Sequence, residues 1–533
     1  MAGGSTDEGR HGRDVYFIEG EGFVGGDPSM LKRIPDKAGE RRRFRFTRIG
    51  PEGGKLGRPI NIKVAQEMTR GTALHDGSIP AGYTYLGQLV DHDLTFDKTA
   101  VALGDNVSPA DMLSGRSPKL DLDCLYGMGP TDPKSAEFYR DDRHLEVGGT
   151  VKAGPGRLKA RVGYDLPRAG DDSPGNKRRA IIPDPRNDEN LAVAQTHAAL
   201  IRFHNRVVDT LDPSVPAAQR FNEARRTVVL HYQWLLKTDY LPRICERSVV
   251  TDVFTNGRKI FDVDAEPTSM PAMPLEFAVG AFRLGHSMVR PLYDWNSEFS
   301  DGGGTLDLLF GFSGTSGFLG GGDLALPSNW IVDWRRLYPF KQIGRTDLKP
   351  PPGEFNTAQI LDTLVSRALD ELPPGSFGGT DADLGTLRTH LAFRNLVRSG
   401  MVHLATGQQM AALLNANGVP VTALTADELL RGAGKGAKLD SLTPAQQDAF
   451  VARTPLWFYV LREAELNGGK LTGVGARIVV ETLHRAMQAA GASIVRQPAW
   501  RPTLSGVANR FTMMDLLLFA FEDDPVKLNP LGD

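Results

Sequence analysis

The chain has 533 residues, and its 62 lysines and arginines nearly balance its 64 aspartates and glutamates. A formal charge of -2 gives no overall attraction to nucleic acid or to an anionic membrane, and 41% hydrophobic residues exclude disorder of the whole chain. No apolar run reaches the length of a membrane span, and the N-terminus lacks the apolar core of a secretory signal peptide. We therefore expect a cytoplasmic protein, or one secreted without a signal peptide. Cys124 and Cys245 are too few for a disulfide scaffold and are expected to be free thiols.

Residues 1–45 are polar and end in a basic run, which predicts an N-terminal arm that is partly extended or flexible. Residues 46–533 are expected to form one domain, because no stretch in them resembles an interdomain linker. Apolar residues spaced by three and four predict helices over residues 83–96, 189–211, 225–241, 273–289, 387–402, 407–417 and 474–491. Strand patterns are scarce, so the predicted fold is mainly α, a single large helical domain with long Gly/Pro loops and little β.

The helix predicted over residues 83–96 carries three polar groups on one face. Gln88, Asp91 and His92 are spaced by three and four residues, so an amide, a carboxylate and an imidazole lie within one turn. A buried histidine with local hydrogen-bond partners would give the same pattern.

A second polar group begins the helix predicted over residues 189–211. Asp184 is typical of an N-cap and Pro185 of the first helical position, which predicts a helix that begins at Arg186. Glu189 would then lie on the same face as Arg186. Taken alone, the pair is better explained as an intrahelical salt bridge than as a catalytic pair.

Two further candidates lie in the C-terminal half of the chain. His286 lies late in the helix predicted over residues 273–289, which Pro291 terminates. Asn395 lies in an apolar helix, where a buried amide needs partners, and a histidine N–H would be suitable.

The stretch from residue 117 to residue 123 alternates oxygen-bearing and apolar groups. In an extended chain Ser117, the Lys119 carbonyl, Asp121 and Asp123 would point the same way and would suit one hard cation. A short strand with one solvated acidic face fits the pattern equally well.

Taken in order, these segments resemble the animal-type haem peroxidases of the peroxidase–cyclooxygenase superfamily, especially the compact bacterial members without disulfides. GQLVDHDLTFD is similar to the family's distal-histidine motif, and DPRNDEN with THAALIRFHNR is similar to its catalytic-arginine segment. AFRLGHSMVRP is similar to the proximal-histidine segment, and RNLVR to the proximal-asparagine segment. The resemblance runs from about residue 45 to about residue 510.

The resemblance implies that haem b lies between the two histidine helices. His286 would be the axial ligand of the iron, and Asn395 would accept a hydrogen bond from the other ring nitrogen. Arg283 and Arg398 would pair with the haem propionates.

On the opposite face of the haem, the resemblance implies that His92 transfers the peroxide proton and that Arg186 stabilises charge as the O–O bond breaks. Gln88 would bind a distal water or a halide. Asp91 and Glu189 match the carboxylates that form ester bonds to the haem.

The resemblance also implies a Ca²⁺ site. Its ligands would be Asp93, Ser117, the Lys119 carbonyl, Asp121 and Asp123. Because Asp93 follows the distal histidine directly, a bound cation would hold the distal helix in place.

The implied function is reduction of hydrogen peroxide and oxidation of small donors, either halides or thiocyanate or phenols, through a ferryl porphyrin-radical intermediate. A fatty-acid dioxygenase of the same superfamily is one alternative, although Arg283 occupies the position of its radical-forming tyrosine. A non-catalytic haem-binding sensor or store is another. Asn190 stands where some members carry the methionine of a sulfonium link to haem, so no such link is expected.

Overall fold

The computed structural model describes residues 44–71, 75–97, 99, 101–112, 114–151, 163–170, 178–321, 323–377 and 379–533. Only the last two residues of the predicted N-terminal arm belong to this part, so the arm lies almost wholly outside the described residues. The division of the chain into an arm and one domain remains a prediction.

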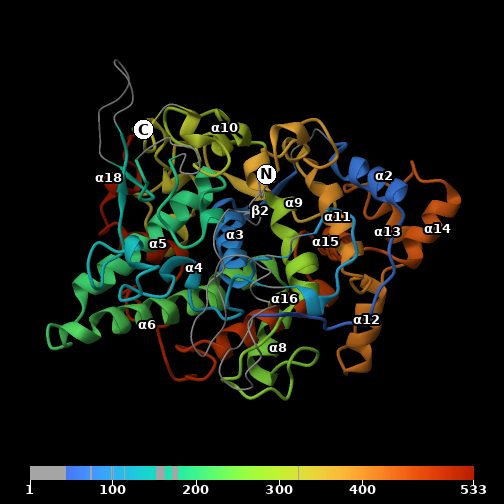
Figure 1. Cartoon of the computed structure of the whole chain (residues 1–533), viewed down its shortest axis with the longest axis horizontal. Coiled ribbons are helices and arrows are strands. Elements are labelled where there is room, and N and C mark those ends of the chain that lie inside the picture. Colours follow the sequence, from blue (N-terminus) through green and yellow to red (C-terminus); the bar gives the residue numbers. More distant parts are fainter. Residues whose placement is uncertain are drawn as a thin grey trace, which may run out of the picture.

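Helices dominate the described part of the chain (Figure 1). The α-helices in the first half are α2 (Arg58–Thr69), α3 (Gly82–Leu94), α4 (Asp123–Tyr126), α5 (Leu191–Thr210), α6 (Ala217–Leu235), α7 (Leu241–Ile244) and α8 (Arg247–Asn256). Those in the second half are α9 (Gly285–Met288), α10 (Leu306–Gly311), α11 (Leu391–Met401), α12 (Gly407–Ala416), α13 (Ala426–Arg431), α14 (Pro444–Ala452), α15 (Leu456–Leu466), α16 (Gly473–Ala489), α17 (Met513–Ala520) and α18 (Pro525–Leu528).

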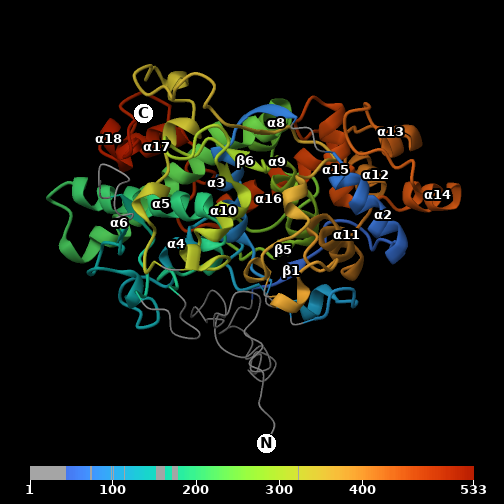
Figure 2. The same cartoon turned by 90° about the horizontal axis from the view of Figure 1, so that it is seen from above.

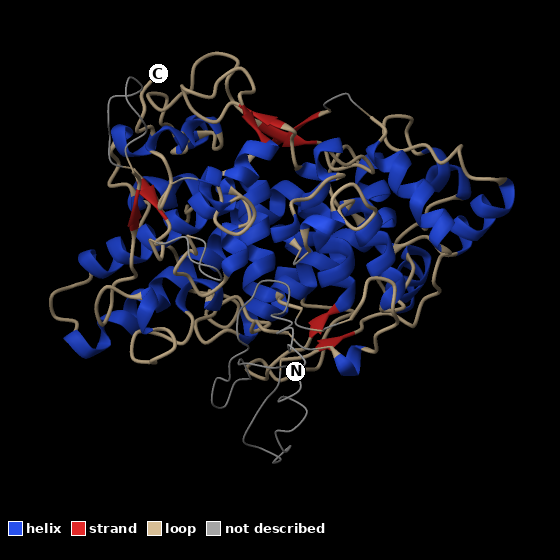
Figure 3. Cartoon of the chain, turned by 45° about the horizontal axis from the view of Figure 1, so that its top comes forward, coloured by secondary structure: helices blue, strands red, loops and turns tan. Residues whose placement is uncertain are grey.

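The strands are short and lie at the periphery of the helical body (Figure 3). They form four two-stranded sheets in the described part, with the pairs β1–β5, β2–β8, β3–β4 and β6–β7. Their bounds are β1 (Phe46–Thr47), β2 (Asp76–Pro80), β3 (Gly148–Gly149), β4 (Tyr164–Asp165), β5 (Met273–Pro274), β6 (Leu292–Tyr293), β7 (Gly304–Thr305) and β8 (Thr357–Gln359). The predicted mainly α fold with little β is confirmed.

Helices α3, α9 and α16 lie in the middle of the molecule, with α5, α6, α17 and α18 on one side and α2 and α11–α15 on the other (Figures 1 and 2). Helix α3 packs against both α5 and α9. The packing around α3 is close, because a Cβ at Gly87 would lie 2.3 Å from the hydroxyl oxygen of Tyr240. Glycine at this position lets the middle of α3 approach the segment that carries Tyr240.

Most of the predicted helices correspond to α3, α5, α6, α11, α12 and α16. The continuous helix predicted over residues 273–289 is wrong. The chain instead forms a π-helical segment, Glu276–Gly280 (η5), a 3₁₀ turn, Ala281–Leu284 (η6), and the single α-helical turn α9. Apolar residues spaced by three and four occur in π-, 3₁₀- and α-helical segments alike. This spacing alone therefore does not distinguish the three helical types.

A second π-helical segment, Leu236–Tyr240 (η4), connects α6 to α7 and carries Tyr240 toward α3. In the described part of the chain, no helix is both long enough and apolar enough to cross a lipid bilayer.

Candidate active site

A cavity of about 170 Å³, partly open to solvent, lies between α3 on one side and the η6–α9 segment on the other. Its polar lining brings together seven residues predicted from the sequence: Gln88, Asp91, His92, Arg186, Glu189, Arg283 and His286. The remaining wall is largely apolar and includes Phe282, Met288, Val289, Leu306, Phe310, Leu369, Leu372 and Leu391. The two imidazoles come from opposite walls of one cavity, which suits a flat apolar group held between them.

On the α3 wall, the His92 ring is almost fully buried and is held from behind by an amide. His92 Nδ1 lies 2.8 Å from the side-chain oxygen of Asn187. The amide nitrogen of Asn187 lies 2.9 Å from Nδ1 of His197, which burial keeps neutral by lowering its pKa to about 3. His92 Nε2 is 4.0 Å from a carboxylate oxygen of Glu189.

Arg186 is held on the same wall by a buried ion pair. Its guanidinium donates to both carboxylate oxygens of Asp184, at 3.0 and 2.7 Å, and to the backbone carbonyl of His92 at 3.0 Å. Arg116 donates to Asp184 from a different segment at 2.8 Å. Burial opposes ionisation of Asp184, but the two arginines hold its pKa well below its usual range. The positive charge of Arg186 therefore stays at one place beside His92.

The local backbone differs from the predicted helix that begins at Arg186. Asp184 does act as an N-cap, but it caps a 3₁₀ turn, Pro185–Asp188 (η3), and α5 starts only after Asn190. The Asn190 side chain caps α5 through Val193 N and also donates to the Gln88 side-chain oxygen at 3.0 Å. The Gln88 amide nitrogen lies 3.4 Å from Glu189, so both ends of that amide have partners.

On the opposite wall, His286 Nδ1 lies 2.8 Å from the side chain of Asn395, as the sequence predicts. The orientation of that amide differs from the prediction, because its nitrogen faces the ring. Arg283 donates to the amide oxygen at 2.9 Å and thereby turns the nitrogen of Asn395 toward His286. An acceptor role toward His286 requires the amide to rotate.

Two of the predicted haem-contacting residues do not line the cavity. Asn395 lies behind His286, and Arg398 forms an ion pair with Asp97. Arg283 does line the cavity, with its guanidinium bonded to Asn395 and to the carbonyl of Ala278. The predicted pairing of Arg398 with a propionate therefore requires it to leave Asp97 or to share it.

The predicted cation ligands form a separate buried cluster next to α3. Oxygens of Asp93, Asp121 and Asp123 lie within 4.8 Å of one another. One carboxylate oxygen each of Asp93 and Asp123 and the hydroxyl of Ser117 are buried and accept no hydrogen bond from the described residues. Burial and the neighbouring carboxylates raise the pKa of Asp93 well above its usual range, and burial raises that of Asp123 to about 7. A divalent cation fits this oxygen set and would compensate its charge.

The backbone of this segment is not the expected extended strand. Leu122 adopts a left-handed conformation with φ of 60°, and Asp123 begins α4. The alternative of a solvated acidic strand is wrong, because Ser117, Lys119 and Asp123 are all buried. Both cysteines are free and buried, as predicted.

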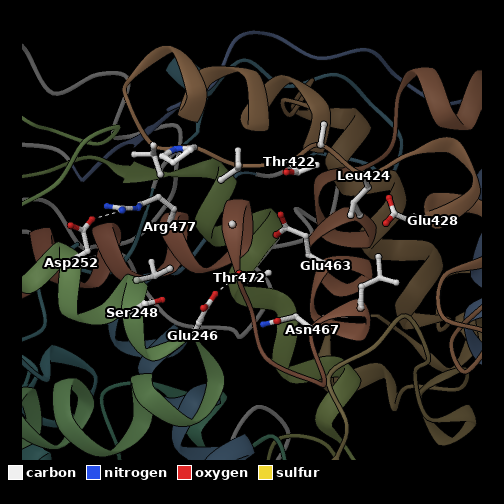
Figure 4. A pocket seen from close by; sticks show the side chains of 17 residues that line it. Glu246, Ser248, Asp252, Thr422, Leu424, Glu428, Glu463, Asn467, Thr472 and Arg477 are labelled. Carbon is white, nitrogen blue, oxygen red and sulfur yellow. Dashed lines mark hydrogen bonds and ion pairs between the residues drawn. The ribbon is translucent and has the colours of Figure 1, made fainter.

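A second cavity, of about 600 Å³, lies between the start of α8 and the loop that joins α15 to α16 (Figure 4). Its charged groups are engaged in structural contacts. Glu463 accepts from two backbone N–H groups at the start of α16, and Thr472 donates to Glu246. Arg477 forms an ion pair with Asp252. This cavity carries no imidazole and no predicted site residue.

Comparison with known proteins agrees with this geometry. Residues 91–309 match the family model described as animal haem peroxidase. A peroxidase-like protein of Margaritifera margaritifera is 24% identical over 272 residues, which cover 43% of this chain and 34% of the relative. Thyroid peroxidase of Canis lupus familiaris is 25% identical over 219 residues, covering 37% of this chain and 23% of the relative. The matched segments thus span about a third or less of these curated relatives.

Solved structures show the same fold over most of the chain. Peroxidase A from Dictyostelium discoideum aligns with a TM-score of 0.53 and 14% identity, covering 92% of this chain and 96% of that one. A fatty acid alpha-dioxygenase of Arabidopsis thaliana aligns with a TM-score of 0.54 and 12% identity, covering 92% and 76%.

The mainly helical fold, the cavity lined by His92 and His286, and a family match that includes both histidines are the features expected of an animal haem peroxidase. The family match, the curated relatives and the shared fold support membership of the peroxidase–cyclooxygenase superfamily. The matched family implies haem as the cofactor.

Sequence reasoning missed three residues that shape the His92 wall: Asn187, Asp184 as the partner of Arg186, and Arg116. Asp184 had been interpreted only as a helix cap. In the sequence, Asn187 stands out only because it follows Arg186. Its contact with His92 depends on the 3₁₀ turn Pro185–Asp188, which the sequence did not predict.

Proposed function

We propose that the chain is a haem-dependent peroxidase that reduces hydrogen peroxide and oxidises small electron donors. The observation that carries this proposal is the single cavity whose lining includes His92, the clamped Arg186 and His286. A non-catalytic haem store would need His286 but would have no use for a guanidinium fixed beside a second imidazole.

In this proposal His286 would hold the haem iron through Nε2, which requires the Asn395 amide to turn its oxygen toward Nδ1. Haem bound there would supply an iron that binds peroxide and accepts its two oxidising equivalents. His92 Nε2 takes the proton from the inner peroxide oxygen and delivers it to the outer oxygen, which leaves as water. Arg186 stabilises the negative charge that develops as the O–O bond breaks.

Two carboxylates on the cavity wall suit covalent attachment of the cofactor. Asp91 and Glu189 both line the cavity, and we propose that they form ester bonds to the haem. Acid–butanone extraction tests this directly, because ester-linked haem stays with the protein and unattached haem enters the organic phase. Variants of Asp91 and Glu189 made singly then show which ester forms.

We further propose that Ca²⁺ occupies the cluster of Asp93, Ser117, Lys119, Asp121 and Asp123. The support is that one buried carboxylate oxygen each of Asp93 and Asp123 and the Ser117 hydroxyl accept no hydrogen bond from the described residues, and that the three aspartates lie close together. Because Asp93 adjoins His92, the ion would fix the end of α3 that carries the base.

The donors proposed are small: halides or thiocyanate by two-electron oxidation and phenols by one-electron oxidation. The test is steady-state turnover of bromide and of guaiacol by haem-loaded protein with hydrogen peroxide. Arg186→Leu should keep the Soret band and slow the reaction with peroxide about a hundredfold, as expected when one charge-stabilising group is lost. Haem-loaded protein that oxidises neither donor, or an Arg186→Leu variant as fast as the wild type, would contradict the proposal.

A further inference from the structure

Asn187 connects the imidazole of His92 to a second buried imidazole. The Asn187 side chain is fully buried, its oxygen lies 2.8 Å from His92 Nδ1, and its nitrogen lies 2.9 Å from His197 Nδ1. Nothing in its own turn requires this amide, because Asp184 supplies the cap of η3. The amide is therefore available to determine which ring nitrogen carries the proton in His92 and in His197.

The two ends of an amide impose opposite roles on the rings they contact. An amide oxygen accepts, so His92 must carry its proton on Nδ1. An amide nitrogen donates, so His197 must present an unprotonated Nδ1, and the His197 proton then lies on Nε2. Burial that keeps His197 neutral is consistent with that acceptor role.

We propose that Asn187 is a positioning residue that holds His92 in the tautomer with Nδ1 protonated and Nε2 unprotonated toward the cavity. The inference rests on the proposed function, since only then does the lone pair on Nε2 become the base that receives the peroxide proton. With the amide turned round, its nitrogen would face His92 Nδ1, and the ring proton would move to Nε2. His92 would then be a donor toward the cavity and could not accept.

His197 is the partner at the other end of the Asn187 amide. Its ring is fully buried, and its Nε2 has no hydrogen-bond partner among the described residues. His197 lies on α5, whereas His92 lies on α3, so the Asn187 amide links the two helices that pack together behind the cavity. The ring at position 197 thus acts on His92 only through Asn187.

The first test measures the tautomer without measuring catalysis. The full chain is labelled with ¹⁵N in its histidines, and the ring nitrogens are observed by NMR in the haem-free protein and in the diamagnetic ferrous carbonyl complex. The His92 signals are assigned by their loss in His92→Gln. A proton on Nδ1 is expected, and a proton on Nε2 in wild-type protein overturns the proposal.

The second test is cyanide binding to the ferric protein, followed by the shift of the Soret band. Hydrogen cyanide binds by giving its proton to a base while cyanide binds the iron, so its affinity reports an acceptor at His92. Asn187→Leu should weaken cyanide binding about 10- to 100-fold, the usual effect of losing an outer-shell partner. Asn187→Asp, which keeps an accepting oxygen, should restore most of the affinity.

Gln195→Leu is the matched control, because this amide lies on α5 and, among the described residues, donates to the carbonyl of Tyr164. It should bind cyanide like the wild type. If Asn187→Leu does not fold, His197→Phe replaces it and should weaken binding in the same direction by a smaller factor. Unchanged cyanide affinity in whichever of these two variants folds overturns the proposal.

The two proposals fail in different ways. Wild-type protein that binds haem but does not react with peroxide refutes the peroxidase function and leaves the tautomer result standing. Wild-type protein that reacts with peroxide while its His92 proton lies on Nε2 refutes only the role of Asn187.

Discussion

The two walls of the cavity are built in different ways. His92 lies on the regular helix α3, is 5% exposed, and has a fixed partner in Asn187, with the ion pair of Arg186 and Asp184 beside it. His286 lies on a single α-helical turn that follows a π-helical and a 3₁₀ segment. Its ring is only partly buried and rests on Asn395, with Trp457 edge-on at 6.5 Å between ring centroids.

The difference corresponds to what each histidine is proposed to do. A proton-transferring base must be oriented before its substrate arrives, so the protein supplies that order through hydrogen bonds and ion pairs. A metal ligand receives much of its order from the bond to the metal itself. An irregular segment is therefore sufficient at position 286 but would not be sufficient at position 92.

The largest effect is expected from His286→Leu. Removing this imidazole should abolish stable haem binding, because no other histidine of the described residues lines that side of the cavity. The ratio of Soret to protein absorbance after haem loading measures this. His403→Leu, a partly exposed histidine whose ring lies 3.7 Å from Glu52, is the control. A His286→Leu variant with a normal Soret band would show that the ligand is elsewhere.

His92→Leu should give the opposite combination. Haem content should match the wild type, while the rate constant for the reaction with peroxide falls about a thousandfold, within the range for loss of a general base. Stopped-flow absorbance measures the rate. If this variant lost its haem instead, the two walls would not have the separate roles described above.

Removal of the proposed Ca²⁺ should loosen the His92 wall and lower the stability of the folded chain. Chelation leaves the carboxylates of Asp93, Asp121 and Asp123 crowded together, and it should lower the free energy of unfolding. The expected loss is about 2.7 kcal/mol if free Ca²⁺ had been at a hundred times its dissociation constant. Thermal unfolding with and without chelator measures it, and Asp123→Ala should no longer respond to Ca²⁺. A melting temperature that Ca²⁺ leaves unchanged would count against the site.

The smallest effect concerns acid stability and His197. Its pKa of about 3 in the folded protein lies below the ordinary histidine value, so its contribution to stability is complete at neutral pH. That contribution is lost as the pH falls below about 6.5 toward 3, at up to about 1.4 kcal/mol per pH unit. His197→Gln should lack this dependence between pH 7 and pH 5 in urea titrations. Parallel curves for the two proteins would show that His197 is not buried in its neutral form.

Much of the fold followed from the sequence because apolar spacing is retained along regular helices. Helices α3, α5, α11 and α16 lie within or almost within the ranges predicted for them. The segment from 273 to 289 failed because π, 3₁₀ and α turns share nearly the same spacing. Tertiary contacts, such as Glu276 accepting from the N–H groups of Ile49 and Gly50, contribute to that segment and leave no local signal.

The order of the motifs in the sequence predicted which residues form the candidate site. It did not predict the contacts that these residues make with side chains from other segments. The sequence pointed to His92, Arg186 and His286, which the structure brings to one cavity. The sequence did not indicate that Arg283 donates a hydrogen bond to the side-chain oxygen of Asn395, or that Arg398 forms an ion pair with Asp97. Each of those partners is chosen by packing between residues far apart in the chain.

The close approach of Gly87 to Tyr240 bears on any attempt to enlarge the cavity by engineering. A side chain at position 87 would displace α3 from Tyr240 and carry the next turn of that helix, including His92, with it. Leu369, Leu372 and Ser376 line the same cavity from a loop that belongs to neither histidine segment. Libraries intended to admit bulkier molecules should therefore vary that loop and keep glycine at position 87.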